Sequence, residues 1–270
     1  MPASRAVLAF TAVLLVAGGI VMEFLVILSG LNTSPLNHVY FLQADTTGIT
    51  GGNDHFRNPA RWTYLAICGV DAGRNANCNP KGAAIPFSPV RNFGTTTGVP
   101  EQFIGTNSYY YLSRVAWAFY LVALFFSVCT FFTSIAAYFA RLGAYMTGFF
   151  ALLAFVFQAL CSALMTAWTV KARNAFRSNN QSASLGVKAY AFSWASTACF
   201  LFAALLFCVG GSVGKSKTTK SKGYFGRKKS TRSNHTRGSF IDSNERGIKD
   251  EYVPFKLSHS FERSSFDRAT

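Results

Sequence analysis

The sequence predicts an all-α membrane protein, in which a bundle of four transmembrane helices carries a small, disulfide-stapled, β-rich extracellular domain. Three observations predict this class. Half of the 270 residues are hydrophobic and only 14% are charged. Four apolar stretches reach the length of about 20 residues that a helix needs to cross a bilayer, and the polar segment between the first two holds a pair of cysteines. A chain with 27 Phe and so little charge is too apolar for an ordinary soluble domain.

The four predicted transmembrane helices are residues 6–28, 115–140, 143–170 and 189–210. The first apolar stretch is longer than the core of a signal peptide, which has about 7–15 residues, and no small-residue cleavage site follows it. We therefore interpret it as an uncleaved anchor. Only two residues separate the second stretch from the third, which predicts a tight antiparallel helical hairpin.

The distribution of charge predicts the orientation. Of the 26 Lys and Arg residues, 14 lie at or after Lys215, and basic segments next to a span stay in the cytoplasm. The tail, residues 211–270, is therefore expected inside. An even number of spans also places residues 1–5 inside, and residues 29–114 and 171–188 outside. Four basic residues of the second outer segment oppose this orientation but are outnumbered by the tail: Lys171, Arg173, Arg177 and Lys188.

Cys68 and Cys78 are the two cysteines in a polar segment, whereas the other four lie in apolar stretches. Disulfides persist outside the cell, and closing a loop of this size removes on the order of 3 kcal/mol of unfolded-state entropy. Residues 61–70 are rich in aromatic and β-branched side chains and turn formers follow them, which predicts two hairpin strands bridged by the disulfide. The alternative is a pair of free thiols in a disordered loop.

The sequence around these cysteines resembles a known family. The resemblance lies in residues 61–64 (RWTY), 68–69 (CG), 77–78 (NC) and 84–93 (AIPFSPVRNF). A four-span layout with Trp shortly before Cys-x9-Cys is similar to the claudin-like superfamily, and the longer motif resembles its fungal branch, the Sur-seven/PalI family. The Gly-Leu-Trp triplet of claudins is missing before the first Cys, which argues against a role in paracellular junctions. The motif residues are Trp62, Cys68, Gly69, Cys78, Pro86, Phe87, Pro89, Asn92 and Phe93.

The resemblance implies a structural plasma-membrane protein of eisosomes, the static furrows of the fungal plasma membrane. It implies effects on membrane organisation, cell-wall integrity and endocytosis, with eisosome membrane-coat proteins as partners. Whether the chain also forms a homo-oligomer stays an open alternative. Asn32 and Asn180 match the glycosylation acceptor pattern in the two predicted outer segments.

Glu23 is the single ionisable residue inside a predicted span. Intramembrane carboxylates are costly and often functional, so the alternative function is a channel or transporter that uses Glu23. A transport site would need partners, and the other three spans contain no Asp, Glu, His, Lys or Arg. We therefore expect a structural role for Glu23.

Small residues at four-residue spacing predict where the helices pack, because lipid gives helices no hydrophobic reason to associate and close contact must hold them together. These stripes are Ala159, Ala163 and Ala167 in the third span and Ala191, Ala195, Cys199 and Ala203 in the fourth. The large aromatic residues of the second and third spans are expected to face lipid: Phe125, Phe126, Phe131, Phe132, Phe149 and Phe150.

The basic tail is too poor in aliphatic residues to fold on its own. Its membrane-proximal part is expected to contact anionic lipid head groups, at about 1 kcal/mol for each basic residue near the surface; the alternative is a topology signal alone. The residues are Lys215, Lys217, Lys220, Lys222, Arg227, Lys228, Lys229 and Arg232. Positive charge concentrated in a tail, rather than on one face of a fold, does not indicate nucleic-acid binding. The sequence shows no catalytic triad, phosphate loop or metal-spaced His/Cys cluster, so we expect no enzyme, cofactor or metal.

Overall fold

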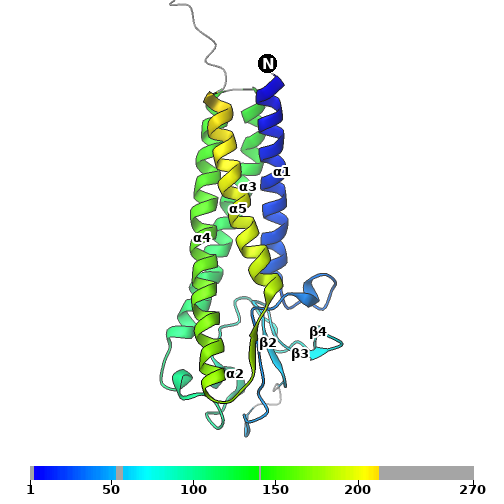
Figure 1. The fold of residues 1–270 in the computed structure, drawn as a ribbon, viewed down its shortest axis with the longest axis vertical. Helices are drawn as coiled ribbons and strands as arrows, with labels where there is room; N and C mark the ends of the chain where they lie inside the picture. Colours follow the sequence, from blue (N-terminus) through cyan, green and yellow to red (C-terminus); the bar gives the residue numbers. More distant parts are fainter. Residues whose placement is uncertain (1–2, 53–56, 140, 213–270) are drawn as a thin grey trace, which may run out of the picture. The chain divides into compact units, whose positions relative to one another are not determined.

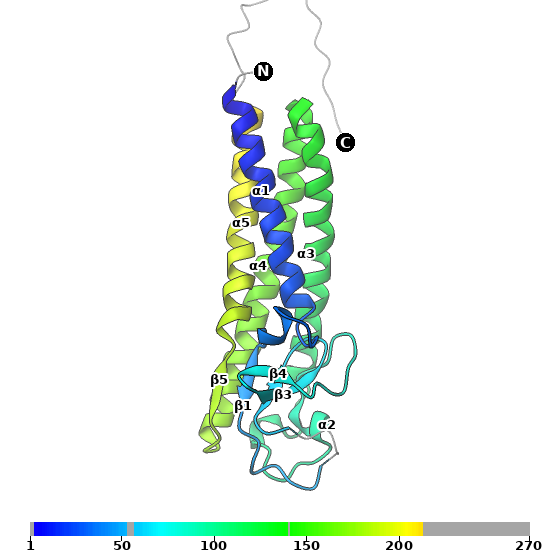
Figure 2. The same ribbon diagram turned by 90° about the vertical axis from the view of Figure 1, so that its right-hand side faces the viewer.

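The computed structural model describes residues 3–52, 57–139 and 141–212. Within these ranges, four helices are long and apolar enough to cross a membrane. They are α1 (Ala3–Ile27), α3 (Ser108–Phe139), α4 (Arg141–Ser178) and α5 (Val187–Ser212), and they run side by side as a bundle (Figures 1 and 2). Together with a small antiparallel sheet and one disulfide, this confirms the predicted fold class.

Two of the helices are longer than a membrane requires. Helix α3 has 32 residues and α4 has 38, so at about 1.5 Å per residue they extend roughly 48 and 57 Å, against about 30 Å for the hydrocarbon core. The end of α4 packs on the sheet, and Tyr109 at the start of α3 packs against Phe103. The segment 171–188, predicted as a loop, is therefore helical as far as Ser178.

The described strands form one antiparallel sheet in the order β4-β3-β2-β1-β5. Strand β5 comes from the connection between α4 and α5 and pairs with β1, with Leu185 opposite Leu42. The two predicted outer segments are thus joined in a single sheet, which we did not predict. The strands are β1 (Leu42–Ala44), β2 (Ala60–Trp62), β3 (Ile67–Asp71), β4 (Arg74–Ala76) and β5 (Ala183–Leu185).

Three short helices complete this end of the bundle: η1 (Leu36–His38), α2 (Pro89–Phe93) and η2 (Glu101–Phe103). We call the strands, these short helices and the adjoining ends of α3 and α4 the sheet domain. Helix α1 begins, and α5 ends, at the opposite end of the bundle (Figure 1).

The register gives the sheet two different faces, because side chains alternate along a strand. Trp62 lies opposite Leu42 and Ile67, and all three are buried. Their neighbour Arg61 lies opposite Gln43 on the other face. One face therefore closes an apolar core against the helices and the other carries polar side chains.

The helices pack only in part through the stripes predicted from the sequence, since Ala203 is buried and Ala159, Ala167 and Cys199 are half-buried. Ala163, Ala191 and Ala195 are exposed on the bundle, so that prediction is wrong for these residues. The buried positions of α4 and α5 instead include small apolar and hydroxyl side chains: Ala151, Ala154, Cys161, Ser162, Ser193, Ser196, Ala203 and Ala204. Helices α1 and α5 approach at Gly19, where a Cβ atom would lie 2.6 Å from Cε1 of Phe200.

Candidate functional site

The family motif forms an aromatic core beneath the sheet. Trp62 is 1% exposed, and its ring centroid lies 5.2 Å from that of Phe87, 5.9 Å from Phe93 and 5.7 Å from Phe176. These pairs have the tilted or edge-on geometry that aromatic rings prefer. The motif tryptophan of β2 is thereby joined to the segment 84–93 and to the end of α4.

Phe87 extends this core towards both long helices. Its ring centroid lies 5.0 Å from that of Trp168 on α4 and 5.9 Å from Tyr109 on α3. Phe103 of η2 fills the remaining side at 5.5 Å. Because Phe87 contacts elements from three parts of the chain, it fixes the sheet domain to the bundle.

Asn92 holds the segment 86–92 in shape with its side-chain amide. The Oδ1 atom accepts the backbone N–H of Ser88 at 3.0 Å and the indole N–H of Trp62 at 3.3 Å, and Nδ2 donates to the carbonyl of Pro86 at 3.1 Å. Pro89 begins helix α2, where its missing N–H is no loss. Both polar atoms of the Asn92 side chain therefore form hydrogen bonds within the protein. The sequence marked Asn92 as a motif residue but gave no signal for this role.

The disulfide between Cys68 and Cys78 is present, as predicted. It joins β3 to the residues that follow β4, and both cysteines are buried. Gly69 of the motif follows Cys68 in β3, opposite Ala76. The bond therefore staples the hairpin at the edge of the sheet.

Arg61, next to the motif tryptophan, is a buried cation with neutral partners. It is 6% exposed, and its guanidinium donates to Oε1 of Gln43 at 2.8 Å, to the carbonyl of Gly73 at 3.0 Å and to Oδ1 of Asn75 at 3.2 Å. It also lies 4.1 Å from the ring centroid of Tyr40. Burial lowers the pKa of Arg61, although an arginine stays charged at neutral pH.

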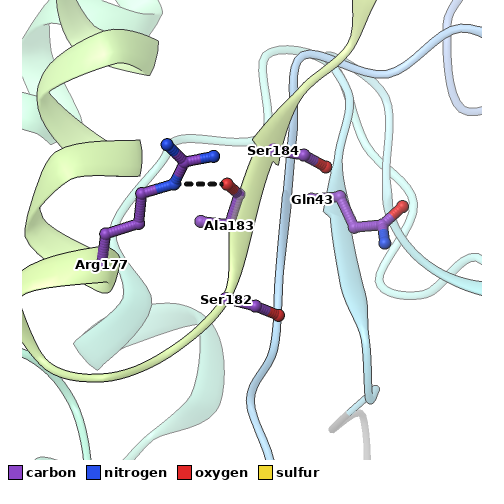
Figure 3. Close-up of a pocket in the computed structure, with 5 residues that line it drawn as sticks. All are labelled: Gln43, Arg177, Ser182, Ala183 and Ser184. Atoms are coloured by element: carbon purple, nitrogen blue, oxygen red, sulfur yellow. Dashed lines mark hydrogen bonds between the residues drawn. The ribbon is translucent and has the colours of Figure 1, made fainter.

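A cavity of about 300 Å³ opens where the end of α4 meets strand β5 (Figure 3). Arg177 donates its Nε–H to the carbonyl of Ala183 at 2.9 Å, which ties the helix to the strand. Gln43 and Ser184 lie on the far side of the strands from Arg177. Since Arg177 bonds to the backbone, its role here is to hold β5 in the sheet. The cavity is lined by Gln43, Arg177, Ser182, Ala183 and Ser184.

The bundle contains a separate set of buried polar side chains. Glu23 is fully buried, and its Oε2 accepts the hydroxyl of Ser127 on α3 at 2.9 Å. Within the part of the chain that the structure describes, Oε1 has no hydrogen-bond partner. Gln158 on α4 donates to Oγ of Ser196 on α5 at 2.7 Å. Tyr120 and Ser193 are also hydrogen-bonded across the bundle. These contacts join neighbouring helices, as polar residues in membrane bundles commonly do.

The remaining predicted residues are placed as follows. Asn32 and Asn180 are both exposed at the sheet end of the bundle, and their glycosylation stays a prediction. Among the described residues there is no group of three or more His, Cys, Asp or Glu that could hold a metal ion. The predicted lipid-contacting residues, from Lys215 to Arg232, lie outside the described residues.

The fold and this core define a class, a four-helix membrane protein whose disulfide-stapled sheet is anchored on a buried tryptophan. A family model described as the SUR7/PalI family matches residues 8–206. The chain belongs to the SUR7/PalI family and is a multi-pass plasma-membrane protein. The matched residues include the second and third spans, most of the first and fourth spans and the whole motif, which confirms the resemblance seen in the sequence.

Named relatives show how far the similarity extends. The chain is 36% identical to the SUR7 family protein FMP45 of Saccharomyces cerevisiae over 210 residues, 77% of this chain and 67% of the relative. It is 36% identical to Protein SUR7 of Candida albicans over 208 residues, 76% of this chain and 75% of the relative. The plasma membrane protein YNL194C of S. cerevisiae, described as uncharacterized, is 34% identical over 68% of this chain and 61% of its own length.

Proposed function

We propose that this chain is a structural, non-catalytic protein that organises eisosomal furrow domains of the fungal plasma membrane, and thereby affects membrane organisation, cell-wall integrity and endocytosis. The observation that carries the proposal is the use of the motif. The rings of Trp62 and Phe87 pack against each other inside the protein, and the side-chain amide of Asn92 hydrogen-bonds to Trp62 and to the backbone of Pro86. A motif used in this way maintains a shape, as an organising protein requires. Family membership supports the same function.

The orientation that we propose places the sheet domain outside and both ends of the chain in the cytoplasm. The disulfide supports it, because such bonds persist in oxidising compartments. Asn32 and Asn180 lie at the same end as the disulfide, so a glycan there would report the orientation. Ser182→Ala removes the Asn180 acceptor pattern and leaves the backbone bond from Asp45 to Ser182 intact. We expect glycosidase to shift the wild-type chain on a gel and the shift to shrink in the variant. Modification of the tail instead would overturn this orientation.

Imaging tests the organising role directly. The full-length chain fused to a fluorescent protein is expected to form immobile cortical patches in living yeast cells that do not recover after photobleaching. A uniformly distributed plasma-membrane protein carrying the same fluorophore is the control for the optics. A uniform or internal pattern of the fusion would contradict the proposal.

The alternative function is a channel or transporter, and the unpartnered Oε1 of Glu23 favours it. Glu23→Gln keeps the hydrogen-bonding shape and removes the charge. We expect this variant to leave ion fluxes unchanged in vesicles reconstituted with the full-length chain. Ser127→Ala is the matched control, since it removes the partner of Oε2 and keeps the carboxyl group. A specific conductance that Glu23→Gln abolishes and Ser127→Ala retains would establish transport.

For partners, we propose anionic lipids at the tail and eisosome membrane-coat proteins. Residues 215–232 carry eight basic residues and no acidic one. They follow a span directly, within reach of a surface potential that decays over about 8 Å at physiological salt. A peptide of residues 215–239 is expected to bind vesicles that contain phosphatidylserine, and to lose binding as salt rises. Equal binding to neutral vesicles would show that these basic residues determine only the orientation of the chain in the membrane.

A further inference from the structure

A second cavity, of about 220 Å³, lies where the sheet domain meets the bundle. Its walls come from η1, from Tyr40 just before β1, from Arg61 within β2, from the turn between β3 and β4, and from the first residues of α5. Figure 2 shows these strands gathered near the ends of the helices. The lining residues are His38, Tyr40, Arg61, Gly73, Val187 and Lys188.

The cavity is surrounded by positive charge. Arg61 and Lys188 line it, and partial burial together with the charges of Lys188, Arg74 and Arg61 lowers the pKa of His38. Two cations, Arg61 of β2 and Lys188 of α5, therefore line one small volume, Arg74 of β4 adds its charge from outside the lining, and the lowered pKa leaves His38 neutral at neutral pH. The residues that line the cavity include no carboxylate.

Arg61 makes this excess charge permanent. Its described hydrogen-bond partners are an amide, a backbone carbonyl and a second amide, from Gln43, Gly73 and Asn75. A buried charge without a counter-ion is costly, so an anion in the cavity would stabilise the site. At about 30 Å³ for each water molecule in the liquid, the cavity has room for a group of several atoms rather than a single ion.

The position of the cavity indicates where this anion comes from. Lys188 is the last charged residue before the apolar part of α5, which continues to Ser212 without another charge. On the same helix, Val187 is 77% exposed and Trp194, seven residues on and on the same face, is 46% exposed. Tryptophan is typical of the membrane interface. An apolar strip that descends into the membrane thus begins at the edge of a cationic cavity.

The start of α5 is held firmly against the sheet. The N–H of Gly186 donates to the carbonyl of Phe41 at 2.9 Å, and a Cβ atom on Gly186 would lie 1.7 Å from the carbonyl oxygen of Tyr40. Only glycine fits this contact. The backbone at Lys188 therefore follows two residues after a close contact with Tyr40, which lines the opposite wall of the cavity.

We propose that this cavity binds the phosphate-bearing head group of an anionic phospholipid in the leaflet on the sheet side of the membrane, with the acyl chains lying along Val187 and Trp194. Lys188 and His38 contact the phosphate, Arg61 supplies a fixed positive charge, and the hydroxyl of Tyr40 donates a hydrogen bond. The proposal does not depend on the eisosomal role or on which side of the membrane the sheet domain occupies.

The test uses the purified full-length chain in mild detergent and measures binding of fluorescent phosphatidylinositol and of phosphatidylcholine with the same label. We expect the anionic lipid to bind more tightly. The double variant Arg74→Gln, Lys188→Gln should weaken its binding roughly tenfold or more, because each basic residue near a lipid phosphate contributes measurably. Both residues are exposed, so the variant is expected to fold.

The matched control is Lys81→Gln, Lys171→Gln, which removes two exposed charges from the sheet domain outside the cavity. It is expected to bind as the wild type does. Equal affinity of the wild type for both lipids, or equal loss in the two double variants, would overturn the proposal. Soluble glycerophosphoinositol separates the two sources of phosphate. We expect it to compete weakly, and complete competition at the lipid's own concentration would assign the cavity to a soluble anion instead.

Discussion

The sheet domain and the helical bundle differ in where many of their aromatic residues lie. In the sheet domain, Trp62, Phe87 and Phe93 are each 1% exposed. In the bundle, Phe125 is 62% and Phe132 is 65% exposed on the side of α3. Some rings of the bundle, such as Phe200 and Phe207, are buried too, but beside them lie buried hydroxyl and amide groups, among them Gln158, Ser193 and Ser196.

The difference follows from the solvent that each region meets. Water drives large apolar side chains into the core of the sheet domain. Lipid is as apolar as phenylalanine, so helices there associate through small residues, which allow close approach, and through polar groups that avoid hydrocarbon. Water governs side-chain packing in the sheet domain, and lipid governs it in the bundle. The same type of substitution is therefore expected to change the free energy of unfolding by different amounts in the two regions.

The largest effect is expected for Trp62→Ala in the sheet domain. Removing a fully buried aromatic side chain leaves a cavity and typically destabilises a protein by about 3–5 kcal/mol. Thermal unfolding of the full-length chain in mild detergent, followed by near-ultraviolet circular dichroism, measures this loss. A shift no larger than that of a lipid-facing phenylalanine would break the comparison.

Removing the disulfide should be the next largest change. Cys68→Ser with Cys78→Ser is expected to lower the free energy of unfolding by about 2–4 kcal/mol, because the unfolded chain regains the freedom that the closed loop denied it. The reductant-treated wild type should show the same shift, and the double variant should no longer respond to reductant. Unchanged stability of both would mean that the aromatic core alone holds the hairpin.

A moderate effect is expected for Gln158→Leu in the bundle, although Gln158 is fully buried. Hydrogen bonds between membrane helices are worth about 0.6–2 kcal/mol, because the separated helices also find partners for their polar groups. Ser196→Ala, which removes the acceptor of the same bond, should produce a similar loss that does not add to the first. A loss as large as that of Trp62→Ala would show that the bundle packs by the rule of the sheet domain.

The smallest effect is expected for Phe132→Ala. This ring lies on the lipid-facing side of α3 and is 65% exposed, so its removal should change the free energy of unfolding by less than about 0.5 kcal/mol. Unfolding in the same detergent provides the measurement. A much larger loss would place a partner on this face of the bundle, such as a second copy of the chain.

The sequence by itself determined the class of the protein. Membrane thickness fixes the length of a spanning helix, so the four apolar stretches could be recognised without any knowledge of their neighbours. The Cys68–Cys78 bond followed from the short spacing of the two cysteines and from the expected outer compartment, which the number of spans and the charge of the tail indicated. The family motif from Trp62 to Phe93 could be read directly as well, and the family match confirmed it.

Only the tertiary structure decided how these parts are joined. Strand β5 has three residues and pairs with β1 about 140 positions earlier in the chain, so no local pattern marks it. No local pattern marks the hydrogen bond between Asn92 and Trp62, or the cationic cavity that Arg61 and Lys188 line, because the residues involved are far apart in the sequence. The small-residue stripes were wrong for Ala163, Ala191 and Ala195 for a related reason: spacing shows which residues share a helix face, but contact with another helix decides which face is buried. Such contacts depend on residues distant in sequence, and a local pattern carries no information about them.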